Sequence, residues 1–303
     1  MTRETVVTVG SFDGVHLGHR AVLEEIAERA RRSERRSLLV TFVPHPLEIV
    51  NPQAAPPLLT LDGERREVLA QSELDAVVFL AFTRQLANTP PESFVRLLFE
   101  RFGMLELVIG HDHGFGRGRA GDVQLLRELG TRLGFAVDLV PPVDIEGREV
   151  SSTFIRRAIG GGNLETAARH LGRLYSMTGT VIEGAGRGRD LGYRTINLSP
   201  PDHRKLLPPD GVYAVRAEWR DGSAGGMMHL GPRPTFDEET RSLEVHLFAA
   251  EPELYGSDVK VSWVRQLRDV MSFGSAAALK DQLDRDRDAA LAALAVPREA
   301  AKG

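Results

Sequence analysis

The first half of the chain alternates short apolar runs with segments whose apolar residues recur every three or four positions. The run 6–9 predicts a buried strand, and the segment 20–32 carries Val22, Leu23 and Ile26 at helical spacing. Further strands are expected at 38–42, 76–82, 106–110 and 135–140, and further helices at 92–102 and 122–133. Strands alternating with helices predict a doubly wound parallel sheet covered by helices on both faces.

After the glycine triplet at 160–162 the pattern changes to closely spaced strands. A short helix is expected at 164–171, strands at 176–183, 211–219, 226–230, 243–248 and 259–265, and a last helix from 276 to about 294. Many short strands with few crossover helices predict an antiparallel barrel. We therefore expect a first domain at residues 1–160, a linker helix at 161–174 and a second domain at 175–297.

Length and composition narrow the class of protein. A chain of 303 residues exceeds one ordinary core, and the absence of cysteine leaves only oxygen and imidazole as metal ligands. A net charge of -4 gives no long-range attraction to nucleic acid. The sequence lacks the run of roughly 20 apolar residues that a membrane span requires, and its first residues lack a signal-peptide core. We expect a soluble cytoplasmic protein, a monomer or weak homo-oligomer, with no nucleic-acid or membrane partner.

The segment from Gly10 to His19, Gly-Ser-Phe-Asp-Gly-Val-His-Leu-Gly-His, leaves a strand and opens a helix. In a doubly wound sheet this point is the carboxyl edge, where ligands bind. Gly14 and Gly18 permit close approach of the backbone, and the helix N-terminus offers N–H groups to an anion. A single histidine at a helix start is usually a cap or a packed side chain. The pair His16 and His19, with these glycines, predicts a preorganised anion site.

The pattern His-x-Gly-His at 16–19 resembles the signature of the nucleotidylyltransferase superfamily. In that superfamily both imidazoles stabilise a triphosphate while its α-phosphorus is attacked and pyrophosphate leaves. Class I aminoacyl-tRNA synthetases share the signature but also carry a Lys-Met-Ser-Lys-Ser loop, and nothing of that kind occurs here. The segment 150–157, Val-Ser-Ser-Thr-Phe-Ile-Arg-Arg, instead brings hydroxyls and guanidinium groups to another helix start. Taken alone, its Ser152 or Thr153 could be an N-cap.

Two more motifs extend the resemblance. The segment 111–122, His-Asp-His-Gly-Phe-Gly-Arg-Gly-Arg-Ala-Gly-Asp, is rich in glycine and arginine, and residues 41–46 read Thr-Phe-Val-Pro-His-Pro. With the motifs at 10–19 and 150–157, they closely resemble the adenylyltransferase half of the bacterial bifunctional riboflavin kinase/FMN adenylyltransferase family, also called FAD synthetase. The residues His111, His113 and Gly114 differ from the acidic, aromatic and basic residues usual there.

The resemblance implies roles for individual residues of the first domain. His16 and His19 would be catalytic, and the ATP site would comprise Gly10, Phe12, Asp13, Gly14, His16, Gly18, His19, Ser152, Thr153 and Arg156. The flavin and its phosphate would lie beside His45, Asp112, Phe115 and Arg117. His45 either orients a phosphate or packs beneath the loop. The spacing of His111, Asp112 and His113 could suggest a metal site, but no further ligand is evident, and an ordinary polar loop is favoured.

The second domain has its own glycine- and arginine-rich segment at 179–198. Such loops cradle phosphates, and small oxygen-bearing side chains such as those in its Thr-x-Asn pair suit Mg²⁺. An ATP-binding flap is one interpretation and a flexible hairpin loop is the other. The motifs Pro-Asp-Gly-Val-Tyr-Ala at 209–214, Leu-Gly-Pro-Arg-Pro-Thr-Phe at 230–236 and Leu-Glu-Val-His-Leu at 243–247 resemble, in order and spacing, the riboflavin kinase half of the same family.

The whole resemblance implies an α/β nucleotidyltransferase domain with a Rossmann-like parallel sheet, followed by an antiparallel β-barrel riboflavin kinase domain with a C-terminal helix. The kinase ATP site would comprise Gly184, Gly186, Arg187, Gly192, Thr195 and Asn197, with Thr195 and Asn197 also binding the metal. Glu244 would be the catalytic carboxylate at the flavin hydroxyl; without its flanking motif it would pass for an exposed strand glutamate.

Two segments of the second domain depart from the family. Arg194-Thr-Ile-Asn stands where Pro-Thr-Ala-Asn is usual, and His229-Leu-Gly where Asn-Ile-Gly is common. Losing the proline removes a fixed φ before the Thr-x-Asn pair.

The expected function is a pair of ATP-dependent reactions. Mg²⁺-ATP phosphorylates riboflavin in the second domain, and the FMN produced attacks the α-phosphorus of a second ATP in the first, giving FAD and pyrophosphate. One alternative is an FMN adenylyltransferase whose barrel only binds flavin, which predicts no FMN from riboflavin. The other is a flavin-binding protein without chemistry, which predicts no release of pyrophosphate.

Overall fold

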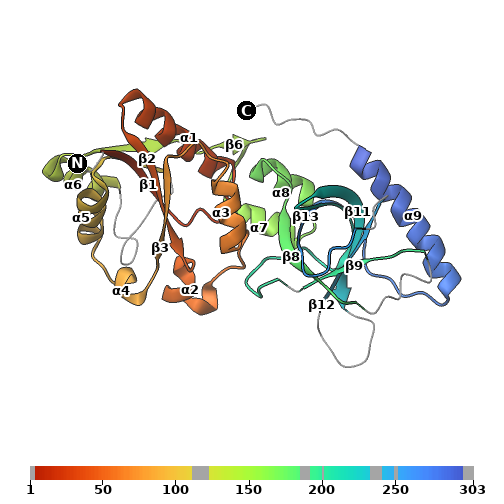
Figure 1. Ribbon diagram of the computed structural model, residues 1–303. Helices are drawn as coiled ribbons and strands as arrows, with labels where there is room; N and C mark the ends of the chain where they lie inside the picture. Colours follow the sequence, from red (N-terminus) through yellow and green to blue (C-terminus); the bar gives the residue numbers. More distant parts are fainter. Residues whose placement is uncertain are drawn as a thin grey trace. The chain divides into compact units, whose positions relative to one another are not determined.

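The computed structural model describes residues 4–110, 123–184, 192–199, 201–232, 241–248 and 252–295. By its internal contacts the chain divides into two compact units, Met1–Ser152 and Thr153–Gly303. Each unit is described by itself below (Figure 1). The division by contacts falls at residue 152, and the domain boundaries expected from the sequence, 1–160, 161–174 and 175–297, stay a prediction.

The first unit is built on a five-stranded parallel sheet with the order β3-β2-β1-β4-β5. The strands are β1 (Thr5–Val9), β2 (Arg36–Val43), β3 (Ala76–Ala81), β4 (Met104–Gly110) and β5 (Ala136–Val140). The strand order reverses between β1 and β4. In doubly wound sheets, ligands bind at the carboxyl ends of the two strands that flank such a reversal. The fold alone therefore directs attention to the turn that follows β1.

Helices cover both faces of this sheet, because alternate residues of each strand point to opposite sides. Val7 and Val9 pack with side chains of α5 (Pro91–Phe102) and α6 (Val123–Leu133), whereas Val6 packs with α1 (Leu17–Arg32). The remaining elements of the unit are α2 (Pro46–Val50), the 3₁₀ turn η1 (Pro52–Ala54), α3 (Asp62–Leu69), α4 (Arg84–Ala87) and the hairpin β6 (Asp144–Ile145) to β7 (Arg148–Glu149). The helix α7 (Ser152–Gly160) begins at the last residue of the unit.

The second unit is a closed six-stranded barrel with the order β10-β11-β12-β9-β8-β13, in which every neighbouring pair is antiparallel. Its strands are β8 (Ser176–Ile182), β9 (Ile196–Leu198), β10 (Gly211–Trp219), β11 (Gly222–Pro232), β12 (Arg241–Leu247) and β13 (Asp258–Arg268). Besides α7, all but the first residue of which belongs to this unit, the described helices of the unit are α8 (Leu164–Leu171) and α9 (Ala276–Ala295). Closure gives each of these six described strands a neighbour on both sides.

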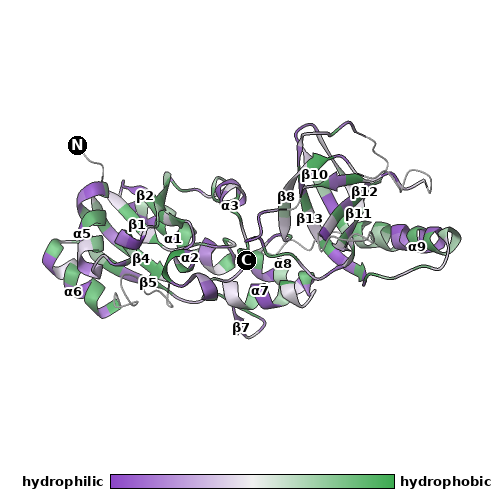
Figure 2. Cartoon of the chain, turned by 90° about the horizontal axis from the view of Figure 1, so that it is seen from below, coloured by the Kyte–Doolittle hydropathy of each residue, from purple (hydrophilic) through white to green (hydrophobic). Residues whose placement is uncertain are grey.

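The long helix α9 packs on the barrel through small residues and one ion pair. Figure 2 shows hydrophobic and hydrophilic residues interspersed along it. Ala290 and Ala293 are buried against Ala214 and Met227 of the barrel wall. The buried Asp286 receives Arg268 Nε at 3.0 and 2.9 Å and Arg268 Nη2 at 2.7 Å. Because the planar guanidinium bonds both carboxylate oxygens, it fixes how α9 is rotated about its axis and where along that axis the helix contacts the barrel.

The parallel sheet, the antiparallel barrel and the C-terminal helix expected from the sequence are confirmed. Helix α1 begins at Leu17 rather than at residue 20, because the His16 side chain caps it. The short elements α2, α3, α4, β9 and the β6–β7 hairpin were not anticipated. In the described part of the chain, none of the helices combines the length and the hydrophobicity that crossing a bilayer requires.

We expect Asp286→Ala to lower the free energy of unfolding of the barrel unit by about 3 kcal/mol, because it leaves a largely buried guanidinium without its carboxylate. Thermal unfolding followed by circular dichroism measures the change. Asp281 lies exposed on the same helix, and Asp281→Ala is the matched control, with an expected change within about 0.5 kcal/mol. Equal melting temperatures for the two variants would show that the ion pair does not hold the helix.

Candidate active sites

The turn that follows β1 has an unusual backbone. Phe12 and Val15 have φ of 49° and 40°, and Gly14 between them has φ of 82°. Glycine adopts this left-handed region readily, but a bulky or β-branched residue there costs about 1–3 kcal/mol. Such a conformation persists only where neighbouring groups hold it. The contacts of this turn therefore decide the geometry of the site.

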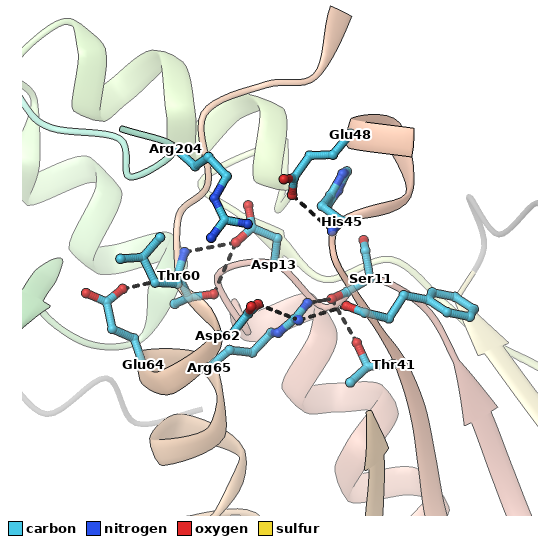
Figure 3. Close-up of polar contacts among 12 residues, drawn as sticks. Ser11, Asp13, Thr41, His45, Glu48, Thr60, Asp62, Glu64, Arg65 and Arg204 are labelled. Carbon is cyan, nitrogen blue, oxygen red and sulfur yellow. Dashed lines mark hydrogen bonds and ion pairs between the residues drawn. The ribbon is translucent and has the colours of Figure 1, made fainter. Parts of the chain in front are cut away.

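One set of contacts joins the turn to the residues just before α3. The carboxylate of Asp13 is buried and accepts the backbone N–H groups of Leu59 and Thr60, each at 2.9 Å. The Thr60 hydroxyl bonds Asp13 at 3.1 Å and accepts the backbone N–H of Gly14 at 3.0 Å. Figure 3 shows Asp13 and Thr60 facing each other in this arrangement. Each oxygen of the Asp13 carboxylate thus accepts one backbone N–H from residues 59–60, which ties the turn to that segment.

A second set of contacts comes from Arg65 on α3. Its side chain is buried and donates to the backbone oxygens of Ser11 at 2.6 Å and Phe42 at 2.8 Å (Figure 3). Burial lowers the pKa of this guanidinium from its ordinary value. Thr41 donates to the same Ser11 oxygen at 3.0 Å. Sequence reasoning missed Thr60 and Arg65, since neither belongs to a periodic pattern or to a glycine-rich turn.

The two histidines of the turn lie face to face. His16 is the N-cap of α1, and its Nδ1 accepts the backbone N–H of His19 at 3.2 Å. Because Nδ1 accepts, a neutral His16 carries its proton on Nε2, where it can be donated to a phosphate oxygen. The rings of His16 and His19 stack with centroids 3.6 Å apart and an angle of 12° between planes. The pair is held as one unit at the start of the helix.

Glycine and aromatic neighbours fix the position of this pair. A Cβ at Gly18 would lie 3.3 Å from the His16 ring, and one at Gly10 would lie 2.9 Å from the Phe12 ring. The Phe12 ring in turn packs on His19 with centroids 4.6 Å apart. The first turn of α1 reads Leu-Gly-His-Arg and has no acidic residue to compete for an anion at the helix N-terminus. An anion at this helix N-terminus would therefore meet no acidic side chain from the first turn of α1.

The other residues predicted for the first domain have more varied surroundings. Ser152 donates its hydroxyl to the backbone oxygen of Asp13 at 3.0 Å, so it lies at the turn. Thr153 and Arg156 belong to the second unit, on α7, where Thr153 is exposed and Arg156 half-buried. His45 caps α2, since its Nδ1 accepts the backbone N–H of Leu47 at 3.3 Å. The predicted residues Asp112, Phe115 and Arg117 lie outside the described residues.

The pairing of the barrel strands brings together several residues that were predicted for the second site. Glu244 on β12 pairs with Asn197 on β9 and, on its other side, with His229 on β11. Directly paired residues of antiparallel strands project from the same face of the sheet. The Glu244 carboxylate accepts the hydroxyls of Ser242 at 2.8 Å and Thr195 at 3.4 Å. The structure therefore places Thr195, Asn197 and Glu244 side by side.

Gly184 lies against this group. A Cβ at Gly184 would lie only 1.9 Å from Asn197 Nδ2, so a larger residue here would displace the Asn197 side chain. Gly192, at the other end of the loop, has φ of 78°. Gly186 and Arg187 lie outside the described residues. Within the predicted flap segment, 179–198, glycine at 184 thus meets a steric demand and glycine at 192 a conformational one.

His229 acquires a context that the sequence did not show. It was recognised only as a departure from the family pattern, whereas the structure places it across from Glu244. Burial lowers the pKa of His229 from its usual value, against the opposing influence of Glu244. The imidazole of His229 is therefore neutral at neutral pH. It stands beside the Glu244 carboxylate, at the position where the family commonly has an asparagine.

The donor set of the second site suits a small hard cation. A hydroxyl, an amide and a carboxylate oxygen come from Thr195, Asn197 and Glu244, and oxygen ligands are what Mg²⁺ prefers. Within the described residues there is no cluster of three or more His, Asp or Glu side chains that could hold a metal.

Fold and sites together define a two-domain transferase, with a histidine-based nucleotidyltransferase sheet and a flavokinase-type barrel. The family model for FAD synthetase matches residues 1–154, and that for riboflavin kinase matches residues 171–294. The chain belongs to the family of bifunctional riboflavin kinase/FMN adenylyltransferases. It is 37% identical over 298 residues to such a protein from Pseudomonas fluorescens, covering 97% of this chain and 94% of the relative.

Other comparisons agree over the same length. A bifunctional riboflavin kinase/FMN adenylyltransferase from Escherichia coli K12 is 35% identical over 283 residues, which are 93% of this chain and 90% of that protein. A crystal structure from Streptococcus pneumoniae, described as a macrolide-efflux protein, matches with a TM-score of 0.87 and 30% identity. That match covers 96% of this chain and 95% of the other. The fold of both units therefore recurs in a solved structure.

We expect His16→Ala and His19→Ala each to slow formation of FAD from FMN and ATP by about 100-fold or more, because each removes a preorganised donor from the charged phosphates. Formation of FMN from riboflavin should stay unchanged in the same preparations. His203 is 92% exposed, and His203→Ala is the matched control. Adenylyltransfer at the normal rate in the His16→Ala, His19→Ala double variant would exclude this site.

Proposed function

We propose that the chain converts riboflavin to FMN in the barrel unit and FMN to FAD in the sheet unit, using one ATP in each reaction. The observation that carries the proposal is the stacked His16–His19 pair at the start of α1, beside the reversal of strand order. Similarity to bifunctional relatives over nearly the whole chain supports both halves. Cytoplasmic location and a monomer or weak homo-oligomer remain our expectations.

In the adenylyltransfer half, a phosphate oxygen of FMN attacks the α-phosphorus of ATP. A new P–O–P bond forms, the bond between the α- and β-phosphates breaks, and pyrophosphate leaves with the electron pair. His16 and His19 bind phosphate oxygens, and the N-terminus of α1 adds its backbone N–H groups. The contacts of Asp13, Thr60 and Arg65 keep these donors in place before the substrate arrives.

In the kinase half, the ribityl 5′-hydroxyl attacks the γ-phosphorus of ATP, and ADP leaves. Glu244 orients this hydroxyl and accepts its proton. The hydroxyls of Ser242 and Thr195 hold the Glu244 carboxylate in place. Thr195 and Asn197 would hold Mg²⁺, which neutralises phosphate charge when it is bound.

One specific observation favours a second candidate, an FMN adenylyltransferase whose barrel only binds flavin. Arg194 and His229 stand where the family usually has proline and asparagine. Both lie in the site that would perform the kinase reaction, His229 directly across from Glu244. The two candidates make opposite predictions for riboflavin as the sole flavin substrate.

A time course with riboflavin and Mg²⁺-ATP, resolved by chromatography, tests both halves together. We expect FMN to appear first and FAD to follow, with ADP and pyrophosphate as the other products. If FMN supplied directly becomes FAD while riboflavin stays unchanged, the barrel has no kinase activity. If neither flavin is converted, the proposal is wrong in both halves.

We expect Glu244→Gln to slow the kinase reaction by about 100-fold or more, because the amide cannot accept the hydroxyl proton. FAD formation from supplied FMN should remain at its normal rate. Glu218 is exposed on β10, and Glu218→Gln serves as the control for altering a strand glutamate of the barrel. Kinase rates that do not differ between the two variants would remove Glu244 from the mechanism.

A further inference from the structure

The backbone that carries Thr195 and Asn197 depends on contacts outside the regular strands. β9 begins at Ile196, so Thr195 lies just before the strand, and Gly192 begins this short approach to it. Arg194 occupies the position before Thr195, where a proline would fix φ through its ring. Because this chain has no proline ring at position 194, we expect side chains of other elements to hold the backbone of residues 192–195.

Tyr193 is the first of these anchors. It is 5% exposed, and its ring packs among Met227 of the barrel wall and Ala290 and Ala293 of α9. Its hydroxyl donates to Asp284 Oδ1 on α9 at 2.5 Å. Burial and this bond raise the pKa of Tyr193 to about 12, so the phenol remains a proton donor at neutral pH. A bond to an ionised acceptor is stronger than one between neutral groups.

The acceptor is itself held on α9. Lys280 Nζ and Arg287 Nη1 each lie 3.5 Å from the carboxylate of Asp284. The hydrogen bond from Tyr193 is the largest influence that lowers the pKa of Asp284. Two residues further along α9, Asp286 forms the ion pair with Arg268 that fastens the helix to β13. Tyr193 is therefore tied to a helix that the barrel holds firmly.

His246 on β12 provides the second anchor. Its Nδ1 lies 2.8 Å from the backbone oxygen of Arg194, and because a carbonyl only accepts, Nδ1 carries the proton. The Tyr193 ring packs edge-on against the His246 ring with centroids 5.0 Å apart. His246 and Glu244 are two apart on one strand and so share a face. The strand that carries Glu244 thus also holds the backbone before Thr195.

We propose that Tyr193, His246 and Asp284 are positioning residues of the kinase site, which hold the backbone of Arg194 so that Thr195 and Asn197 stand beside Glu244. The anchors perform the work that proline at 194 would perform through its ring. Helix α9 is thereby a part of the kinase site, through the bond between Asp284 and Tyr193. This inference rests on the kinase half of the proposed function.

The test compares Tyr193→Phe, Asp284→Ala and Asp284→Asn in the full chain, by kcat and KM for Mg²⁺-ATP in FMN formation. We expect Tyr193→Phe and Asp284→Ala to lower kcat/KM for Mg²⁺-ATP by about 10-fold or more, since small displacements of binding groups are costly. Asp284→Asn keeps an oxygen acceptor and should retain most of the activity. Asp281→Ala, on an exposed position of α9, is the control, and FAD formation from supplied FMN should not change.

A second variant separates positioning from simple loss of stability. Introducing Arg194→Pro into Tyr193→Phe restores a fixed φ without restoring the bond to Asp284. We expect this double variant to recover kinase activity over Tyr193→Phe. Normal kinetics for Tyr193→Phe, or no recovery with proline, would overturn the inference while leaving the kinase assignment intact. A wild-type chain that forms no FMN would overturn both.

Discussion

The chemistry of the sheet unit depends on a backbone conformation that its own residues do not favour. Phe12 and Val15 adopt left-handed φ values, and the turn they form sets where α1 begins and hence where His16 and His19 stack. The strain is offset by hydrogen bonds that run to residues 41–65, far along the chain. Since these bonds form when the unit folds, the turn that carries His16 and His19 is already organised before any substrate binds.

In the barrel unit, the pairing register of the strands brings the residues of the candidate site together. His229, Glu244 and Asn197 come from three adjacent strands and share a face because antiparallel pairing places them opposite one another. A slip of one residue in either pairing would move a side chain to the other face. β9 contributes only three residues to this pairing, so its alignment needs support from beyond the ladder. The contacts of Tyr193 and His246 provide that support.

Much of this architecture follows from local sequence. The parallel sheet was predictable because strand-like runs alternate with helical periodicity, and the His16 and His19 pair because its glycine spacing is distinctive. Thr60 and Arg65 could not be found in this way, since their importance comes from carbonyls and amides that approach only in the folded chain. The same holds for Asp284, one of several acids on α9, which only the packing of that helix brings to Tyr193. β9 was missed because three residues show no usable periodicity.

The carboxylates of Asp13 and Glu244 have different hydrogen-bond partners, and this difference matches the two nucleophiles, the phosphate of FMN and the hydroxyl of riboflavin. FMN presents a phosphate that is already an anion, so the first reaction requires charge stabilisation and no base. Accordingly, the carboxylate of Asp13 is buried and bonded to backbone N–H groups. Riboflavin presents a neutral alcohol, which must lose a proton as it attacks. In the proposed kinase site, the hydroxyls of Ser242 and Thr195 donate to the Glu244 carboxylate and orient it toward that alcohol.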